Sequence, residues 1–189
     1  FEDVGQWKRA RYYPHPDESM RDAVARECAA VRARAGALDV STLGKIDVQG
    51  PDAAEFMNRL YTNRMDTLKP GRCRYGLMLK DDGMVFDDGV VARITADHYH
   101  LTTTSGNAAA VMDWLEDWLQ TEWPHLRVRL TSVTEQWAGV AVAGPDARQI
   151  VSRLAPEADL SNEALPHLAW TDAEVSTGQA RIYRVSFSG

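Results

Sequence analysis

The sequence predicts an α+β fold made of two related ferredoxin-like (split βαβ) units, of which the second is truncated. From residue 45 to 134 the apolar residues recur first at strand spacing and then at helix spacing, in the order β-α-β-β-β-α-β. An Asp-Asp-Gly turn at residues 81–83 joins two strand-like segments. VQGPDAAEFMNRL (48–60) and VAGPDARQIVSRL (142–154) also share seven of thirteen residues, which favours a duplicated unit.

The elements follow from local patterns along the chain. Residues 17–35 read as a helix in which Met20, Val24, Cys28 and Val31 recur at helical spacing, so we expect Cys28 on a buried stripe. Pro51 opens the second helix after a short strand. The remaining predicted elements are strands over 73–83, 84–94, 98–104 and 127–133, and an amphipathic helix over 107–123.

Composition limits the classes of function. A net charge of −6, with 44% hydrophobic and 25% charged residues, is ordinary for a globular protein and argues against a nucleic-acid binder. The longest apolar run is far shorter than the ~20 residues of a membrane-spanning helix, and the first residues contain no signal-peptide core. Cys28 and Cys73 lie far apart without a CxxC motif. We therefore expect a cytoplasmic protein that binds neither nucleic acid nor membranes.

The segment GMVFDDGVVARI (83–94) carries two adjacent carboxylates inside a strand-like sequence. Side chains on a strand alternate between its faces, and the even positions from 84 to 94 are apolar except for Asp88. The alternation predicts that Asp88 points inward and that Asp87 is exposed, although a bulge at Gly89 could re-aim one of them. A buried carboxylate is either satisfied by turn amides or works in a pocket, and the pattern leaves both interpretations open.

Other groups of residues give weaker evidence for a functional site. His98 and His100 share a strand face, but no third ligand has suitable spacing, so we expect no metal site. The sequence contains no GxGxxG, P-loop or GxSxG motif. Tyr75, beside the Asp-bearing strand, could form the wall of a pocket for a flat aromatic ligand.

Several longer segments resemble a known family. GALDVSTLGKIDVQGPDAAEFMNRLYTN, then YGLMLKDDGMVFDDGVV and VAVAGPDA, resemble the folate-binding family of the glycine-cleavage aminomethyltransferase (T-protein), over most of the chain. FEDVGQWKRARYYP, GRCRYGLMLKDDGMVFDDGVV and LQTEWP are most similar to the C-terminal part of the α subunits of heterotetrameric sarcosine oxidases. The resemblance implies three parts: an N-terminal helix segment (1–44) packing with the second unit, a ferredoxin-like unit with the Asp pair (45–136), and an incomplete second unit (137–189) without the family's C-terminal barrel.

The resemblance also implies a tetrahydrofolate site. The second acid of the Asp pair, here Asp88, approaches the reactive nitrogens of the folate in this family. Leu43 stands where the family usually has Met, and Tyr75 matches a pocket-wall tyrosine. Thr103 and Thr104 fall on a strand that lines the same pocket. Phe187 replaces the usual Tyr, so a hydrogen bond from that hydroxyl is expected to be missing.

The implied activity is capture of the one-carbon unit of oxidised sarcosine as 5,10-methylenetetrahydrofolate. The implied partners are a flavin-bearing β subunit and small subunits, with the flavins and NAD bound in other parts of the enzyme, and the fragment alone is expected to be inactive. Three alternatives remain open: a glycine-cleavage aminomethyltransferase, a non-catalytic folate-binding scaffold or assembly protein, and a purely structural subunit interface.

Overall fold

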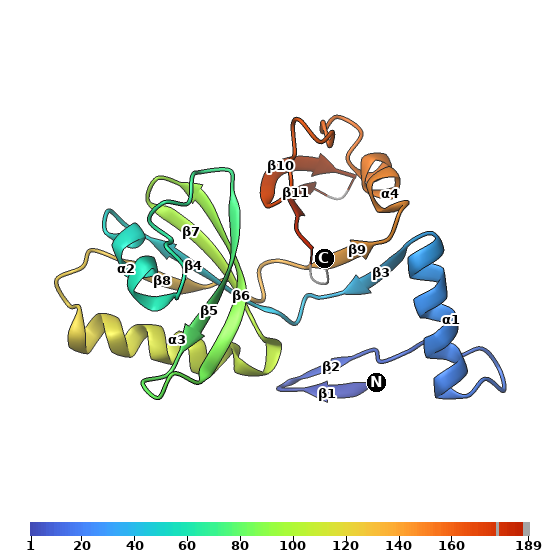
Figure 1. Ribbon diagram of the computed structural model, residues 1–189, viewed down its shortest axis with the longest axis horizontal. Coiled ribbons are helices and arrows are strands. Elements are labelled where there is room, and N and C mark those ends of the chain that lie inside the picture. Colours follow the sequence, from blue (N-terminus) through green and yellow to red (C-terminus); the bar gives the residue numbers. More distant parts are fainter. Residues whose placement is uncertain (177, 187–189) are drawn as a thin grey trace.

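The protein is described by a computed structural model covering residues 1–176 and 178–186. It is a mixed α/β structure whose largest part is an antiparallel sheet with strand order β5-β6-β7-β4-β8 (Figure 1). The predicted order β-α-β-β-β-α-β is confirmed. The elements are β4 (Gly44–Gln49), α2 (Ala53–Leu60), β5 (Cys73–Leu79), β6 (Val85–Thr95), β7 (His98–Thr103), α3 (Ala108–Asp117) and β8 (Arg129–Ser132).

The main core lies between this sheet and the helices α2 and α3, which cover the same face. Apolar residues at helical spacing on both helices meet the inward residues of β4, β6 and β7. Burial of this area supplies the main stabilisation, at roughly 25 cal/mol per Å² of apolar surface. The fully buried members include Ile46, Val48, Phe56, Met57, Val91, Tyr99, Leu101, Val111 and Leu115.

The Asp-Asp-Gly turn joins β5 to β6 as predicted. Gly83 has φ = +81°, a conformation that L residues with a side chain rarely adopt. The pairing of β5 with β6 shifts register between Met78 and Leu79, because Met78 is opposite Asp87 while Leu79 is opposite Val85. Phe86 is therefore the extra residue of a β-bulge, which interrupts the alternation of β6 just before the two aspartates.

The two copies of the repeated sequence form the same local structure. Gly50 (φ = +141°) and Gly144 (φ = +112°) each end a strand, and each carbonyl accepts a 3.0 Å hydrogen bond from the amide three residues later, Ala53 or Ala147. The helices that follow are α2 and α4 (Ala147–Leu154). Beyond this turn the surroundings differ, because within residues 1–176 and 178–186 β9 (Val140–Ala143) pairs with β3 (Gly36–Asp39) and with no other strand. Duplication of the whole unit stays a prediction.

The N-terminal part contains a short hairpin, β1 (Glu2–Val4) and β2 (Trp7–Arg9), which the sequence patterns did not predict. Ser19 is the N-cap residue of α1 (Met20–Ala33), and its side chain accepts a hydrogen bond from the Asp22 amide. The expectation that Cys28 is buried is wrong: Cys28 is exposed, and Ala23 is the buried residue of α1. Within the described residues α1 contacts chiefly β3 and the Gly144 turn, so little of its apolar stripe is covered.

A second hairpin, β10 (Ala169–Val175) and β11 (Gly178–Arg184), packs beside the edge strand β5. The Cys73 amide donates to the Leu168 carbonyl at 2.7 Å, and the Trp170 indole donates to the Arg93 carbonyl at 3.1 Å. The His100 and Tyr183 rings stack with centroids 6.4 Å apart. Figure 1 shows this hairpin above the segment that connects the sheet to α4. The hairpin therefore covers part of the sheet face that α2 and α3 leave free.

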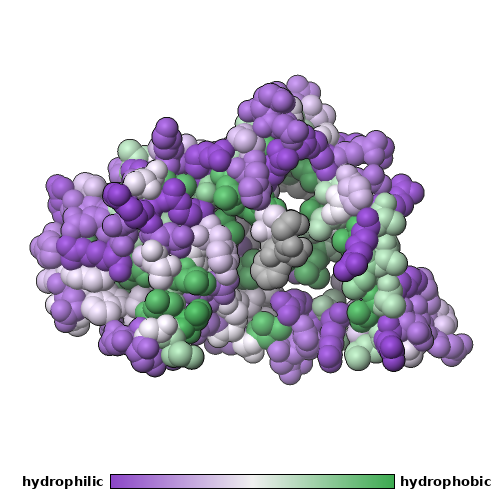
Figure 2. Space-filling model, in the orientation of Figure 1, coloured by the Kyte–Doolittle hydropathy of each residue, from purple (hydrophilic) through white to green (hydrophobic). Residues whose placement is uncertain are grey.

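The space-filling view shows a hollow at the centre of the molecule, between the five-stranded unit and the arm formed by α1 and β3 (Figure 2).

None of the helices in the described part of the chain has the length and hydrophobicity that a bilayer span requires.

Candidate functional site

The Asp pair lies in β6 with the opposite orientation to that predicted. Asp87 is buried, with 4% of its surface exposed, and faces the helices, whereas Asp88 is half-buried on the other sheet face. The prediction failed because the alternation was extended through the bulge at Phe86. After the bulge the odd positions face the core, as the complete burial of Val91 shows.

Asp88 presents its carboxylate beside an aromatic side chain. Tyr75, on the neighbouring strand β5, donates its hydroxyl hydrogen to Asp88 Oδ2 at 2.7 Å. Half of the Tyr75 surface is exposed, and the hydrogen bond to Asp88 is the main cause that raises the pKa of the phenol. A carboxylate accepts up to about four hydrogen bonds, so Asp88 retains capacity for a donor from a ligand.

Asp87 has the environment of a structural carboxylate. It accepts hydrogen bonds from the Thr104 amide, at 3.2 Å to Oδ2, and from the Thr104 hydroxyl, at 2.5 Å to Oδ1. Burial raises the pKa of Asp87, and the hydrogen bonds from Thr104 oppose that shift. The sequence left open whether the buried carboxylate is satisfied by turn donors or works in a pocket. The structure assigns the first role to Asp87, which Thr104 satisfies, and leaves Asp88 as the candidate for the second.

Side-chain hydrogen bonds connect residues 86–90 of β6, which include the two aspartates, to the end of β7 and the turn that follows it. Backbone pairing of β6 with β7 begins only at Val91. Before that point the Thr102 hydroxyl accepts from the Val90 amide at 3.0 Å, and Asn107 Nδ2 donates to the Phe86 carbonyl at 3.0 Å. Gly89 makes the close approach possible, because a Cβ there would lie 1.9 Å from the Thr102 carbonyl oxygen.

The two threonines expected to line the pocket lie in different places. Thr103 is buried, on the helix side of β7 with Tyr99 and Leu101, so the expectation that it faces the pocket is wrong. Side chains on β7 alternate between the two sheet faces, so Thr102, and not Thr103, lies on the sheet face of Asp88. Thr104 is exposed and reaches Asp87 through the hydrogen bonds described above.

Leu43 belongs to a segment that a buried lysine holds in place. Lys45 Nζ donates to the carbonyl oxygens of Ser41, Leu43 and Thr134 at 2.9, 2.8 and 3.1 Å. Burial lowers the pKa of Lys45. Leu43 itself is half-buried. Phe187, the remaining predicted residue, lies outside the described residues.

A third carboxylate, Asp47 on β4, shares the sheet face of Asp88. It contacts His100 Nδ1 at 2.7 Å through Oδ1 and His98 Nε2 at 3.3 Å through Oδ2. Burial disfavours its charge, but hydrogen bonds from His100 and His98 outweigh that effect and hold the pKa of Asp47 well below its ordinary value. Across residues 1–176 and 178–186, no group of three His, Cys, Asp or Glu side chains is arranged to hold a metal ion.

The Asp47 cluster predicts a specific loss of stability in acid. Because the pKa of Asp47 is lower in the folded than in the unfolded state, its stabilisation is complete above about pH 4 and is lost as the pH falls toward the folded value. We expect Asp47→Asn to reduce the pH dependence of the unfolding free energy between about pH 5 and 3. Urea unfolding across this range measures it. Asp113→Asn, on the exposed side of α3, is the control, and an equal slope in wild type and Asp47→Asn would contradict the prediction.

The whole chain, residues 1–189, matches the family model described as "GCVT N-terminal domain". The chain belongs to this family.

Curated members of related families agree with this assignment. The sarcosine oxidase α subunit of Corynebacterium sp. (strain U-96) is 58% identical over 190 residues, which cover all of this chain and 20% of that subunit. A probable aminomethyltransferase of Haloarcula marismortui is 35% identical over 193 residues, covering all of this chain and 49% of the relative. The chain thus spans about a fifth of the length of the sarcosine oxidase subunits that it matches.

Solved structures share the fold of this GCVT domain. The aminomethyltransferase T of the glycine cleavage system from Bartonella henselae superposes with a TM-score of 0.74 at 24% identity, covering 88% of this chain and 42% of that one. A chain of the heterotetrameric sarcosine oxidase from Corynebacterium sp. U-96 in complex with pyrrole 2-carboxylate gives a TM-score of 0.57 at 13% identity, covering 87% and 80% of the two chains.

The GCVT domain offers a donor and acceptor set that suits a reduced folate. The pterin part of a folate is a flat ring system that carries N–H donors. Among the residues that the structure describes, the Asp88 carboxylate accepts a hydrogen bond from the Tyr75 side chain and from no other side chain, which leaves acceptor capacity. The half-exposed Tyr75 ring beside it supplies a flat wall. Of the predicted residues, the structure therefore brings Asp88 and Tyr75 together. It adds Asp87 and Thr102, which sequence reasoning missed because the signal, a bulge at Phe86, depends on strand pairing.

Proposed function

We propose that this chain is the tetrahydrofolate-binding domain of a sarcosine oxidase α subunit, in which it captures the one-carbon unit of oxidised sarcosine as 5,10-methylenetetrahydrofolate. The proposal rests on one observation above all: Asp88, the acid that the family places against the folate, has a partly open carboxylate beside Tyr75. The 58% identity to a sarcosine oxidase α subunit supports the choice of enzyme.

The proposed architecture has three parts. Residues 1–44 form the N-terminal segment, 45–136 the unit that carries the Asp pair, and 137–189 a second, incomplete unit of the same type. The shared Gly-Pro-Asp turn supports this duplication, and the pairing of β3 with β9 supports packing of the first part on the third.

In the proposed mechanism Asp88 acts as a hydrogen-bond acceptor and general base. The bound folate supplies the nucleophilic amines that take the one-carbon unit. Asp88 Oδ1 or Oδ2 would accept the proton of a folate amine as that nitrogen bonds to the one-carbon unit, which raises the nucleophilicity of the nitrogen. The bond between that carbon and the nitrogen of the oxidised sarcosine would break, and glycine would leave. Tyr75 keeps the carboxylate in place through its hydroxyl, and its half-exposed ring would pack against the ring system of the ligand. The oxidation of sarcosine itself belongs to flavins bound in other subunits or domains of the proposed enzyme, with which the chain would be assembled.

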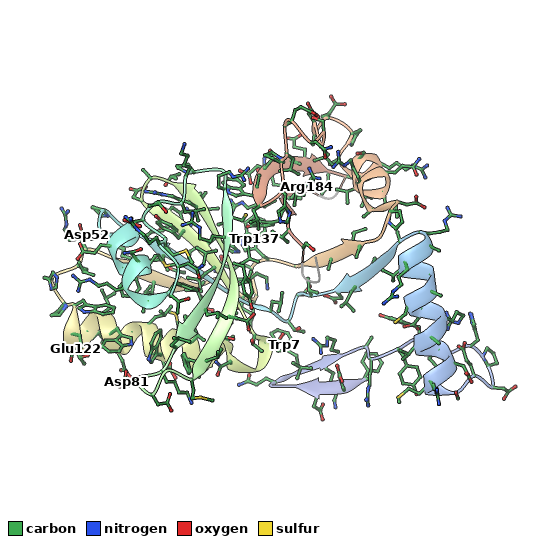
Figure 3. All side chains as sticks on the ribbon, in the orientation of Figure 1. Trp7, Asp52, Asp81, Glu122, Trp137 and Arg184 are labelled. Atoms are coloured by element: carbon green, nitrogen blue, oxygen red, sulfur yellow. The ribbon has the colours of Figure 1, made fainter. Side chains whose placement is uncertain are left out.

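Titration with a reduced folate tests the binding step. We expect 5-formyltetrahydrofolate, a stable reduced folate, to change the tryptophan fluorescence of the wild-type protein saturably. Asp88→Ala should weaken binding by about tenfold or more, because a hydrogen bond to a charged group is lost. Asp81→Ala is the matched control, since Asp81 is exposed in the turn between β5 and β6, outside the paired residues of both strands (Figure 3). Equal affinity of Asp88→Ala and wild type would remove Asp88 from the site.

A glycine-cleavage aminomethyltransferase is the second candidate. The 35% identity to a probable aminomethyltransferase across the whole chain favours it. That enzyme class takes its aminomethyl group from a lipoyl-carrying protein, whereas the sarcosine oxidase takes a one-carbon unit from oxidised sarcosine. Formation of methylenetetrahydrofolate from an aminomethylated lipoyl carrier would therefore support the alternative, and its formation during sarcosine oxidation would support the main proposal.

A further inference from the structure

Two neighbouring carboxylates on β6 have different partners and different surroundings. Asp87 is directed into the protein and accepts two hydrogen bonds from Thr104, whereas Asp88 is directed out and contacts Tyr75. The two residues share a peptide unit, and successive side chains on a strand point to opposite faces. Any rotation of β6 that moves one carboxylate therefore moves the other.

On the β7 side, the strand that carries Asp88 lacks the usual backbone ladder. The paired residues of β6 and β7 run from Val91 to Thr95, so residues 86–90 lie beyond the ladder. The bulge at Phe86 further loosens the pairing with β5 just before Asp87. Residues 87–90 are paired with β5 on their other side, from Asp87 opposite Met78 to Val90 opposite Tyr75. A segment with a ladder on one side has more freedom to twist than one with ladders on both, so side-chain contacts to β7 contribute to its orientation.

Those contacts come from residues 102–107. Thr102 binds the backbone of Val90, accepting from its amide at 3.0 Å and donating to its carbonyl at 3.3 Å. Asn107 binds the carbonyl of Phe86. The Phe86 ring packs against Trp114, with ring centroids 5.1 Å apart. Between the two backbone attachments, the Asp87 side chain binds Thr104. Its bond to the Thr104 hydroxyl, at 2.5 Å, is short and charge-assisted.

We propose that Asp87 is a positioning residue: by binding Thr104 on the core side of the sheet, it fixes the twist of β6 that presents Asp88 to Tyr75 and to the ligand. This inference rests on the proposed function for its ligand, but its geometric part concerns only residues of this chain. Asp87 has no access to the ligand face, so it acts through Asp88. The two oxygens of Asp87 satisfy both donors of Thr104, the amide and the hydroxyl.

The titration of Tyr75 gives a readout that does not need a ligand. Its phenol pKa is raised mainly by the hydrogen bond to Asp88, so the midpoint reports whether Asp88 is in place. Thr104→Val removes the hydroxyl that holds Asp87 while keeping both carboxylates and all their charges. NMR of protein labelled with [13Cζ]tyrosine follows the six tyrosines separately, and Tyr75→Phe identifies the resonance of Tyr75.

We expect the Tyr75 midpoint to fall toward its ordinary value in Thr104→Val and to return in Thr104→Ser, which restores the hydroxyl. In the same variants the affinity for 5-formyltetrahydrofolate should fall about tenfold and recover. Far-UV circular dichroism checks that each variant is folded, and Thr104→Ala replaces Thr104→Val if the valine variant is not.

The possible outcomes separate the two proposals. An unchanged Tyr75 midpoint in folded Thr104→Val or Thr104→Ala would overturn the positioning role, whatever the protein binds. A wild-type protein that binds no reduced folate would instead overturn the proposed function, and the Tyr75 titration would still decide the role of Asp87. A fall in the midpoint that Thr104→Ser does not reverse would show a general disturbance and would also count against the positioning role.

Discussion

Asp88→Asn is expected to lower the rate of one-carbon capture by about a hundredfold, within the range of general base catalysis. The amide has nearly the shape of the carboxylate and its oxygen still accepts a hydrogen bond from Tyr75, so the contact at 2.7 Å can persist. What disappears is the group that takes the proton from the folate amine. The variant thus separates the basic function of Asp88 from its structural contact.

The measurement is the product partition during sarcosine oxidation by the enzyme assembled with this domain. In the presence of tetrahydrofolate, Asp88→Asn should release formaldehyde where the wild type forms 5,10-methylenetetrahydrofolate, and sarcosine consumption should stay unchanged because that oxidation occurs at a flavin. Asp81→Asn, at the hairpin tip, should behave like the wild type. An undiminished yield of methylenetetrahydrofolate from Asp88→Asn would exclude the base role.

Gly89→Ala is expected to cause the largest loss of stability of any single methyl addition near the site. The new Cβ would lie 1.9 Å from the Thr102 carbonyl oxygen and 2.8 Å from its carbonyl carbon, and both are backbone atoms that no rotamer change can move. β6 and β7 would have to separate where Thr102 binds Val90. We expect the free energy of unfolding to fall by about 3 kcal/mol, at the upper end of the usual cost of overpacking.

Gly106→Ala is the matched control for this substitution. The nearest atom to a Cβ at Gly106 is the Gly5 amide nitrogen at 3.8 Å, which is an ordinary contact. Its unfolding free energy should stay within about 1 kcal/mol of the wild type, since replacing Gly reduces the entropy of the unfolded chain. Urea unfolding followed by tryptophan fluorescence measures both variants. Similar midpoints for the two variants would contradict the prediction, because they would show that the β7 backbone at Thr102 can move away at little cost in free energy.

Local patterns predicted the elements of the five-stranded unit because each depends on neighbouring residues. The apolar spacing of α2, the Asp-Asp-Gly turn and the alternation within β4 and β7 are all readable from the sequence. The repeated Gly-Pro-Asp turn was predictable for the same reason. The resemblance to the T-protein family then selected Asp88 without knowledge of its orientation.

The orientation of the Asp pair depended on a contact that the sequence does not display. A bulge inserts one residue in β6 relative to β5, so its position follows from strand pairing and not from β6 alone. The misplacement of Thr103 is of the same kind, since one residue decides which face a side chain occupies. Cys28 was misassigned because helical spacing marks an apolar stripe but does not say whether another element covers it.

The pairing of β3 with β9 has a consequence for the order in which the chain folds. Residues 44–132 contain all strands of the five-stranded sheet, whereas Gly36 meets Ala143, more than a hundred positions further along. Loops of that length close slowly, so contacts between near neighbours should form first. During synthesis on the ribosome, the arm formed by α1 and β3 therefore emerges before β9, its pairing partner. We expect this arm to stay accessible to chaperones or proteases until the five-stranded sheet has formed.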